Sequence, residues 1–366
     1  MPPTTKLWPL EEHTKGKHLV LKAYLDAWIP KLGFWNGRIL FIDGFAGPGE
    51  YAGGEEGSPL IALRAFLNHS AKDRLKASVL FDFVEQDPKR AAHLETLVMP
   101  LRVQLPALCA AEVSVGAFDE TMTGLLDALE EQKKKLAPAF VMIDPFGVSD
   151  TPMEVIRRIL RNEHCEVYVS FMYEAINRFK GTPEFEPHLD KLFGCRDWRQ
   201  GLEILDGEKR KQFFYGLYES QLRKAGASSV VHFDLYDEGR LIYAIFFATQ
   251  HWQGADAMKQ AVWKSIPVGS FAFHGTRSRQ LTLNIDQPNF EPLKKMLKKR
   301  FAGKGWVSIQ DIQEFVGSDQ TDYHTQQLKG GALKPMEQAG DFEIDEKSRK
   351  RKLTCPEGTK LRFPTK

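Results

Sequence analysis

The chain has 366 residues, of which 42% are hydrophobic and 27% charged, and its formal net charge is +2. So high an apolar fraction with so small a net charge excludes a disordered chain. No apolar run reaches the roughly 18–20 residues that a membrane span needs, so we expect no membrane partner. The length suits one large domain or two to three smaller ones.

Cysteine and histidine usage excludes several kinds of site. Cys109, Cys165, Cys195 and Cys355 are far apart, which argues against a disulfide framework and a cysteine zinc site. The histidines show no H-x-x-x-H or H-E-x-x-H spacing, so we expect no metal. The first residues lack the apolar stretch of a secretory signal, and we therefore expect a cytoplasmic protein.

In chain order, the pattern predicts helices that alternate with short apolar strands. A helix over residues 17–29 should be stopped by Pro30 and Gly33, and a helix should open at Asp87 and Pro88. We expect strands at 38–43, 78–84, 112–115, 139–143 and 165–171, with further helices at 59–67, 121–136 and 152–161. A helical insertion should occupy residues 174–225, before a hairpin of strands 230–235 and 240–249 and a helix at 254–263. This alternation indicates a parallel doubly wound sheet with an antiparallel addition at one end.

The C-terminal segment has a different pattern. Helices at 291–300, 308–316 and 321–338, followed by two strands within 342–363, match the winged-helix order. We therefore predict two domains, 1–285 and 286–366. Residues 291–366 carry a net charge of +5, whereas the rest carries −3.

This basic surplus suggests a polyanion partner. Lys295 and Lys299, on the lysine-rich first helix of the segment, are our candidates for nucleic-acid contacts. The alternative is a solvated helix face.

Glycines follow the first strand, from Asp43 onward. Gly44, Gly47 and Gly49 have the spacing G-x-x-G-x-G, which lets the backbone approach a nucleotide-like ligand near a helix N-terminus. A tight turn without a ligand is the alternative.

Two acids follow the second strand. A carboxylate at this position can accept hydrogen bonds from the ribose hydroxyls of an adenosine-type cofactor. We assign Glu85 to the ribose and Asp87 to capping the next helix.

The fourth strand ends in Asp144, Pro145 and Phe146. The amine of a nucleobase is a poor nucleophile, and an acceptor on its N–H raises electron density at nitrogen as a methyl group arrives. Asp144 is our candidate acceptor, Pro145 restricts the turn, and Phe146 offers a stacking face for the base. The alternative is an ordinary Asp-Pro turn.

These stretches carry a family resemblance. F-I-D-G-F-A-G-P-G-E-Y at 41–51, G-S-P-L at 57–60 and D-P-F-G at 144–147 resemble the three-Cys-motif partner family, which is methyltransferase-like and named for a genomic neighbour with a three-cysteine motif. They are also similar to the bacterial 23S rRNA adenine-N6 methyltransferases, which share a Lys-His pair like Lys17-His18. The D-P-F-G form resembles the tRNA N2,N2-guanine dimethyltransferases.

The resemblance implies a class I methyltransferase (Rossmann-like) fold, S-adenosyl-L-methionine as cofactor and an exocyclic base amine as acceptor. It implies that Asp43 belongs to the cofactor site and that Asp119, after the third strand, reaches the cofactor's adenine amine. It places Lys17, His18 and Tyr51 near the substrate. The chain departs from the adenine-N6 pattern, because D-P-F-G lacks the second proline and the terminal aromatic, and Gly116, Ala117 and Phe118 come before Asp119.

Our leading hypothesis is a methyltransferase acting on an amino group of RNA or DNA. The alternative is a non-catalytic partner of a three-Cys-motif protein that binds cofactor and nucleic acid. Methylation of a small molecule or a protein is a third hypothesis, and the oligomeric state stays open.

Overall fold

The computed structural model describes residues 5–148, 151–237, 240–265, 271–275, 289–349 and 351–365. The domain boundary predicted near residue 285 lies outside these residues.

Within the described residues, one eight-stranded sheet has the order β3-β2-β1-β4-β5-β7-β6-β8. The block from β3 to β5 is parallel, and β7, β6 and β8 are antiparallel to their neighbours. This order is that of the class I methyltransferase (Rossmann-like) fold, as predicted. The strands are β1 (Arg38–Asp43), β2 (Ser78–Glu85), β3 (Ala110–Val115), β4 (Ala139–Ile143), β5 (Glu166–Phe171), β6 (Ser229–Asp237), β7 (Arg240–Thr249) and β8 (Phe271–Gly275).

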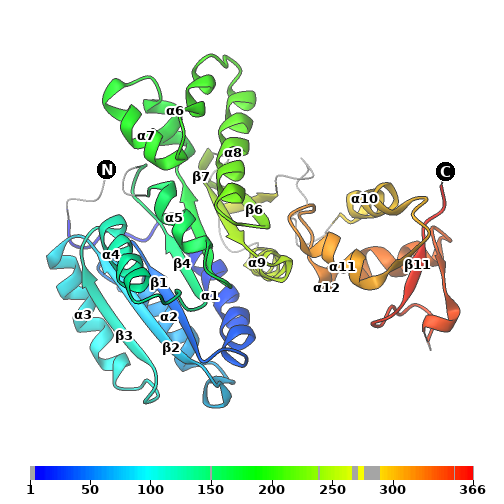
Figure 1. Ribbon diagram of the computed structural model, residues 1–366, viewed down its shortest axis with the longest axis horizontal. Coiled ribbons are helices and arrows are strands. Elements are labelled where there is room, and N and C mark those ends of the chain that lie inside the picture. Colours follow the sequence, from blue (N-terminus) through cyan, green and yellow to red (C-terminus); the bar gives the residue numbers. More distant parts are fainter. Residues whose placement is uncertain are drawn as a thin grey trace.

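Helices cover both faces of the sheet (Figure 1). One face carries α1 (Glu12–Gly33), α2 (Ser58–Leu67), α3 (Pro88–Arg102) and α9 (Trp252–Ser265), with the 3-10 turn η1 (Lys72–Arg74) after α2. The other face carries α4 (Phe118–Glu131), α5 (Met153–Leu160) and α8 (Gly207–Lys224). None of the helices in the described part of the chain is long and apolar enough to cross a bilayer.

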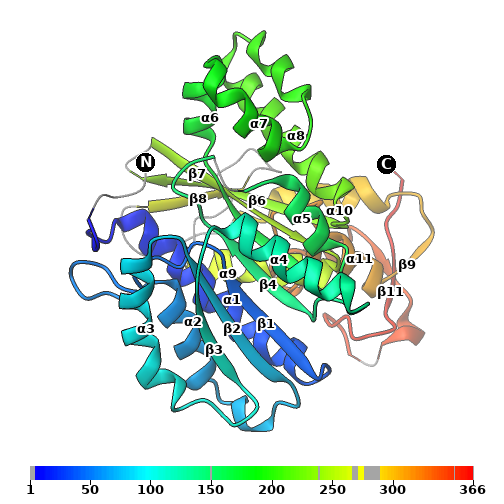
Figure 2. The same cartoon turned by 60° about the vertical axis from the view of Figure 1, so that its left-hand side comes forward.

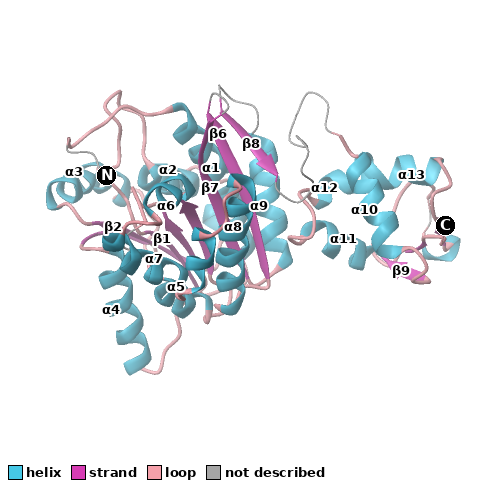
Figure 3. Cartoon of the chain, turned by 90° about the horizontal axis from the view of Figure 1, so that it is seen from above, coloured by secondary structure: helices cyan, strands magenta, loops and turns pink. Residues whose placement is uncertain are grey.

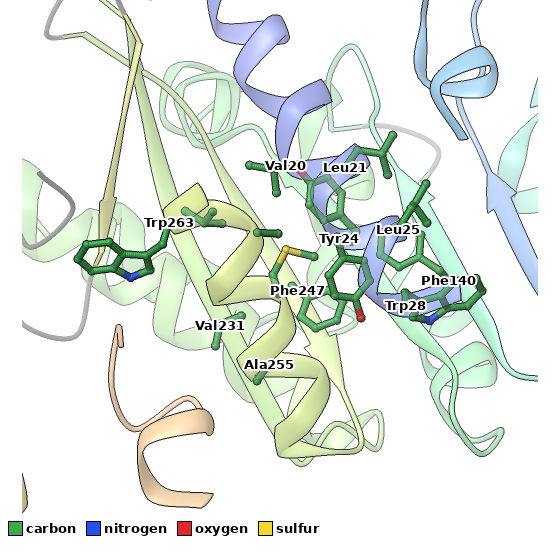
Figure 4. Packing of buried hydrophobic residues seen from close by; sticks show 14 of the residues in the cluster. Val20, Leu21, Tyr24, Leu25, Trp28, Phe140, Val231, Phe247, Ala255 and Trp263 are labelled. Carbon is green, nitrogen blue, oxygen red and sulfur yellow. The ribbon is translucent and has the colours of Figure 1, made fainter. Parts of the chain in front are cut away.

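Aromatic side chains join α1 to the sheet (Figure 4). Tyr24 lies with its ring centroid 5.2 Å from that of Phe140 on β4 and 5.2 Å from that of Phe247 on β7. Trp28, one turn further on, packs against the same Phe140 ring. α1 therefore spans the junction between the parallel and antiparallel parts of the sheet. This packing holds the first turns of α1 over the carboxyl ends of the strands, where the candidate site described below lies.

Of the two residues predicted to stop the first helix, Pro30 lies inside α1 and Gly33 is its last residue. Proline has no N–H, so the carbonyl of Asp26 loses its helical donor. His69 replaces that donor with its Nε2–H, 3.1 Å from the Asp26 oxygen, while its Nδ1 accepts from Ala71 N–H. A side chain 43 residues away in the sequence thus satisfies the group that Pro30 frees, which local pattern cannot reveal.

The predicted insertion is mainly helical. It consists of α6 (Tyr173–Phe179), η2 (Pro183–Phe185), α7 (Glu186–Phe193), η3 (Asp197–Leu202) and α8. Figure 2 shows α6 and α7 standing together beyond the end of the sheet.

Residues 289–365, called here the C-terminal module, contain helices and a three-stranded antiparallel sheet of order β10-β11-β9. The predicted order of three helical segments before the last two strands is present, but β9 was not predicted. The helix predicted over 321–338 begins only at Thr325 and includes a π-helical stretch. The elements are α10 (Glu291–Phe301), β9 (Trp306–Ser308), α11 (Ile309–Gly317), α12 (Thr325–Gln327), η4 (Leu328–Leu333), α13 (Lys334–Gln338), β10 (Glu343–Ile344), η5 (Glu346–Ser348) and β11 (Lys360–Arg362).

A buried lysine of α9 connects the C-terminal module to the part of the chain that contains the eight-stranded sheet, called here the body. Lys259 is fully buried, and its Nζ donates to the carbonyls of Val316 at 2.6 Å, Ser318 at 2.6 Å and Thr321 at 3.1 Å. The Val316 carbonyl belongs to the last turn of α11 and the other two follow that helix, and their binding to one ammonium holds the segment before Thr325 outside a helix.

The start of α12 is also held by the body. Asp256 of α9 accepts hydrogen bonds from the Thr325 N–H and hydroxyl, both at 2.7 Å, and Trp263 donates to the Asp322 carbonyl at 2.9 Å. Figure 3 shows α12 and α11 as the elements of the module nearest α9. The module is therefore a fixed part of the molecule, and the N-terminus of α12 faces the body.

We expect Lys259→Met to lower the free energy of unfolding, because the Ser318 and Thr321 carbonyls lose this donor at a cost of about 1–3 kcal/mol each, whereas the Val316 carbonyl still accepts from the Thr321 hydroxyl. Urea denaturation of the full chain measures this loss. Lys264→Met, at an exposed position on the same helix, is the matched control. Equal stability of Lys259→Met and the wild type would show that the three hydrogen bonds do not hold the module.

Candidate functional site

The carboxyl ends of the parallel strands open onto two adjoining cavities. The smaller cavity, about 420 Å³, lies over the ends of β2 and β3, and the larger one, about 850 Å³, lies between α1 and the glycine-rich loop after β1. Phe45, Pro145 and Phe146 line both. In open α/β sheets, ligands bind in the crevice outside the carboxyl ends of the strands, so this edge is the candidate site.

The glycine-rich loop has a conformation that requires glycine. Gly47 and Gly49 have φ angles of +62° and +85°, in the left-handed region that side chains disfavour. A Cβ on Gly44 would come within 2.3 Å of the Phe118 ring. The loop therefore needs the three predicted glycines for its turn and its packing, and Gly47 and Gly49 also line the larger cavity.

Glu85 connects this loop to the next strand end. Its Oε2 accepts from Gly47 N–H and its Oε1 from Asp87 N–H, each at 2.8 Å. A carboxylate has about four acceptor positions, so two remain for a ligand, and Glu85 lines the smaller cavity. This chemistry fits the predicted ribose hydroxyls. Asp87 caps α3 by accepting from Lys89 N–H and Arg90 N–H, as predicted.

Two acids predicted for the cofactor site do not reach either cavity. Asp43 is fully buried beneath the glycine-rich loop, where its Oδ1 accepts from Phe45 N–H at 3.2 Å. Asp119 lies in the first turn of α4 and accepts from the adjacent Glu120 N–H. The residues just before Asp119, from Gly116 to Phe118, line the smaller cavity in its place.

Asp144 faces the larger cavity and forms an ion pair with Lys17 of α1. Lys17 is 7% exposed and Asp144 is 26% exposed. Burial favours a higher pKa for Asp144, but the charge of Lys17 and its hydrogen bond outweigh burial and hold the pKa of this carboxyl below its usual value. Asp144 is therefore ionised at neutral pH, and a carboxylate only accepts hydrogen bonds.

The structure brings His18 and Tyr51 to the same cavity. Burial, helped by the charge of Lys17, lowers the pKa of His18 to about 3, so its ring is neutral at neutral pH. Its Nε2 lies 3.4 Å from the Tyr51 hydroxyl, and burial raises the pKa of Tyr51 to about 12. These two side chains thus add polar but uncharged groups beside the Lys17–Asp144 pair. Lys295 and Lys299 lie on α10 of the C-terminal module and line neither cavity.

Sequence reasoning missed Trp8, which forms a wall of the larger cavity. Its ring lies edge-on to Phe146 at 5.5 Å and to Tyr51 at 6.1 Å, and the Arg90 guanidinium stands 5.2 Å from it. Ala52 N–H donates to the Trp8 carbonyl at 2.8 Å. Trp8 precedes the first helix, so no periodicity could have placed it. Phe146 itself is 39% exposed, whereas Pro145 is buried.

Comparisons with known proteins find only distant likeness. No protein family model matches the chain. None of the curated proteins matches it either. Among solved structures, the chain is similar to an O-methyltransferase from Bacillus cereus in complex with SAH, at 14% identity and a TM-score of 0.34, over 66% of this chain and 82% of that one. It is also similar to fibrillarin from Aeropyrum pernix with natively bound S-adenosyl-L-methionine, at 14% identity and a TM-score of 0.29, over 63% and 76%. A precorrin-6y C5,15-methyltransferase from Geobacter metallireducens matches at 9% identity and a TM-score of 0.28, over 62% and 86%. With likeness this low, the fold assignment depends on the strand order.

Asp43→Asn should stabilise the protein at neutral pH. Burial raises the pKa of Asp43 to about 6, from an ordinary value near 3.9. The native state therefore binds a proton more readily than the unfolded state, and stability falls as pH rises from about 4 to about 6. Asparagine removes this cost, which is about 3 kcal/mol above that window and zero below it. Thermal or urea unfolding from pH 4 to 7.5 measures it.

The matched control for this experiment is Asp73→Asn, since Asp73 is exposed on η1. An Asp43→Asn protein whose stability followed the wild-type pH dependence would show that Asp43 is not the group that titrates in this window.

Proposed function

We propose that the protein is an S-adenosyl-L-methionine-dependent methyltransferase that methylates an exocyclic amino group of a base in RNA or DNA. One observation carries the proposal: a paired, ionised Asp144 lines the larger cavity close to the half-exposed Phe146, which lines both cavities. An acceptor beside an aromatic face is what a stacked base amine requires.

The smaller cavity suits the adenosine part of the cofactor, with Glu85 accepting from the ribose hydroxyls. Gly47 and Gly49 allow the rest of the cofactor to approach the loop after β1. When bound, S-adenosyl-L-methionine supplies an electrophilic methyl group. The chain's own residues then have only to position the amine and to exclude water.

Asp144 accepts a hydrogen bond from the amine N–H and so keeps electron density on nitrogen. Lys17 donates to its Oδ2, and acceptor capacity remains on the carboxylate. Phe146 stacks on the base, and Trp8 limits the space beside it. Lys17 has a positioning role, because it holds the carboxylate ionised and in place between α1 and β4.

The C-terminal module has the helix and strand order of a winged helix, and we propose that it helps to hold the nucleic acid. In that fold the N-terminal part of the recognition helix contacts the base edges. Here the corresponding α12 begins against α9. We therefore assign the contact with nucleic acid to α10, and the exposure of Lys295 and Lys299 supports this assignment.

A second candidate function is a non-catalytic partner of a three-Cys-motif protein. The observation that favours it is the Lys17–Asp144 pair itself, since an acceptor already bound by an ammonium is less available to a base amine. Methyl-transfer assays with labelled donor on total RNA, DNA and protein separate the two. A wild type that binds the cofactor but methylates none of them supports the partner function.

We expect Asp144→Ala to lower turnover on the order of 10²–10³-fold, as for loss of one preorganised electrostatic contact. Cofactor affinity should change little, because Asp144 lines only the larger cavity. Single-turnover methylation and calorimetry with S-adenosylhomocysteine measure the two quantities. The control is Asp119→Ala, which removes an acid outside both cavities. Full methyl transfer by Asp144→Ala would contradict this mechanism.

The double variant Lys295→Gln, Lys299→Gln should reduce the salt dependence of nucleic-acid binding in the full chain. Each lost phosphate contact lowers the slope of log affinity against log salt by about 0.9 for duplex DNA or about 0.7 for single strands. Filter binding or fluorescence anisotropy at several salt concentrations measures the slope. Lys329→Gln with Lys334→Gln, both exposed near α12, is the matched control. An unchanged slope in the α10 variant would assign the module to protein docking.

A further inference from the structure

The helical insertion supplies one wall of the smaller cavity. Ala175 and Phe179 come from α6, Phe185 from η2 and His188 from α7, and all four line the cavity together with residues that follow β1, β2, β3 and β4. The rest of the insertion packs away from this edge, in the core cluster on the α5 and α8 face of the sheet. The insertion is therefore in contact with the proposed adenosine site.

The two phenylalanines of this wall form a pair of rings at the cavity surface. The ring centroids of Phe179 and Phe185 are 4.9 Å apart with an interplanar angle of 39°, and the His188 ring lies 5.7 Å from Phe185. Phe179 is 38% exposed, although phenylalanine is among the residues most often buried. Exposed aromatic side chains that line a cavity mark a surface that a planar apolar ligand can cover.

The packing and hydrogen bonds of α7 hold this wall in place. Leu189, Leu192 and Phe193 of α7 are buried in the core. Asp190, on the same helix, accepts from Trp198 Nε1 at 2.7 Å and from Arg199 Nη1 at 2.6 Å. A preorganised wall costs less entropy on binding than one that must be ordered by the ligand.

The opposite side of the cavity lacks the acid that sequence resemblance placed there. Asp119 lies in the first turn of α4, where its side chain accepts a hydrogen bond from the Glu120 N–H. Gly116, Ala117 and Phe118 line the cavity instead. The lining at this strand end thus offers no carboxylate for the adenine amine. Recognition of the adenine ring must depend on its faces more than on its amine.

We propose that the helical insertion completes the cofactor site, with Phe179 and Phe185 forming the stacking wall for the adenine ring. This inference rests on the proposed function, because it takes the ligand of the smaller cavity to be the adenosine of S-adenosyl-L-methionine. It assigns a binding role to the insertion. It also explains how the protein holds the adenine ring although no acidic side chain that follows β3 lines the cavity.

The test is calorimetry of the full chain with two probes, S-adenosylhomocysteine and 5′-methylthioadenosine, which share the adenosine group. Phe185→Ala and Phe179→Ala should each weaken binding about 5-fold to about 140-fold, the range that loss of one aromatic–base stack produces. Both probes should lose the same factor, since the change affects only their common part. Phe185→Tyr should keep most of the affinity, and Asp119→Asn should keep all of it.

Leu202→Ala is the matched control, because Leu202 lies on the same insertion with 39% exposure but does not line the cavity. Thermal unfolding of each variant checks that it is folded. If Phe185→Ala unfolds at a lower temperature, Phe179→Ala decides, since its half-exposed ring contributes less to the core.

The outcomes separate the two proposals. A wild type that binds neither probe contradicts the cofactor assignment, and with it this inference. A wild type that binds both, with Phe179→Ala and Phe185→Ala binding equally well, overturns the stacking wall alone. Equal losses in Leu202→Ala, or a loss in Asp119→Asn, would also overturn it.

Discussion

The parallel hydrogen bonding of β2, β1, β4 and β5 is the constraint on which the site depends. Parallel strands need helical connections, and those helices bury both faces of the sheet. Only the strand ends remain for binding. All parallel strands end at the same edge, so residues that follow β1, β2 and β4 meet there although up to about 100 positions separate them in the chain. Glu85 joins the first two ends, and the Lys17–Asp144 pair joins the third to α1.

Buried charge in this protein is used to fasten elements together. Lys17 binds α1 to the end of β4, and Lys259 binds α9 to the turn after α11. A buried ion costs several kcal/mol to desolvate, so it is retained only where hydrogen bonds satisfy it fully. Lys259 meets that requirement with three carbonyls, and its role is structural. The Lys17–Asp144 pair differs, because Asp144 keeps partial exposure toward a cavity and can exchange partners.

The helical insertion and the C-terminal module both lie outside the central sheet, and they differ in how close they come to the strand ends. The insertion from α6 to α8 reaches the smaller cavity directly through Phe179 and Phe185. The C-terminal module is fixed on α9 and contributes no residue to either cavity. In the proposed function, the insertion contacts the cofactor inside the site, and the module would contact nucleic acid outside it.

The sequence by itself determined strands β1 to β7, the glycine-rich loop, the Asp87 cap and the position of Asp144, because each depends on local pattern or on residues adjacent in the chain, whereas β8 and β9 were not predicted. Family resemblance, not local pattern, grouped Lys17, His18 and Tyr51, and the structure brings all three to the larger cavity. Only the tertiary structure decided that Trp8 lines the cavity and that α1 continues through Pro30 with help from His69. It also decided that Asp119 misses the cavity, since one helical turn at Phe118 sets the direction of that side chain. The positions of Trp8 and of the α1 segment at Pro30 depend on contacts between segments far apart in the chain, and no periodicity or spacing within one segment records them.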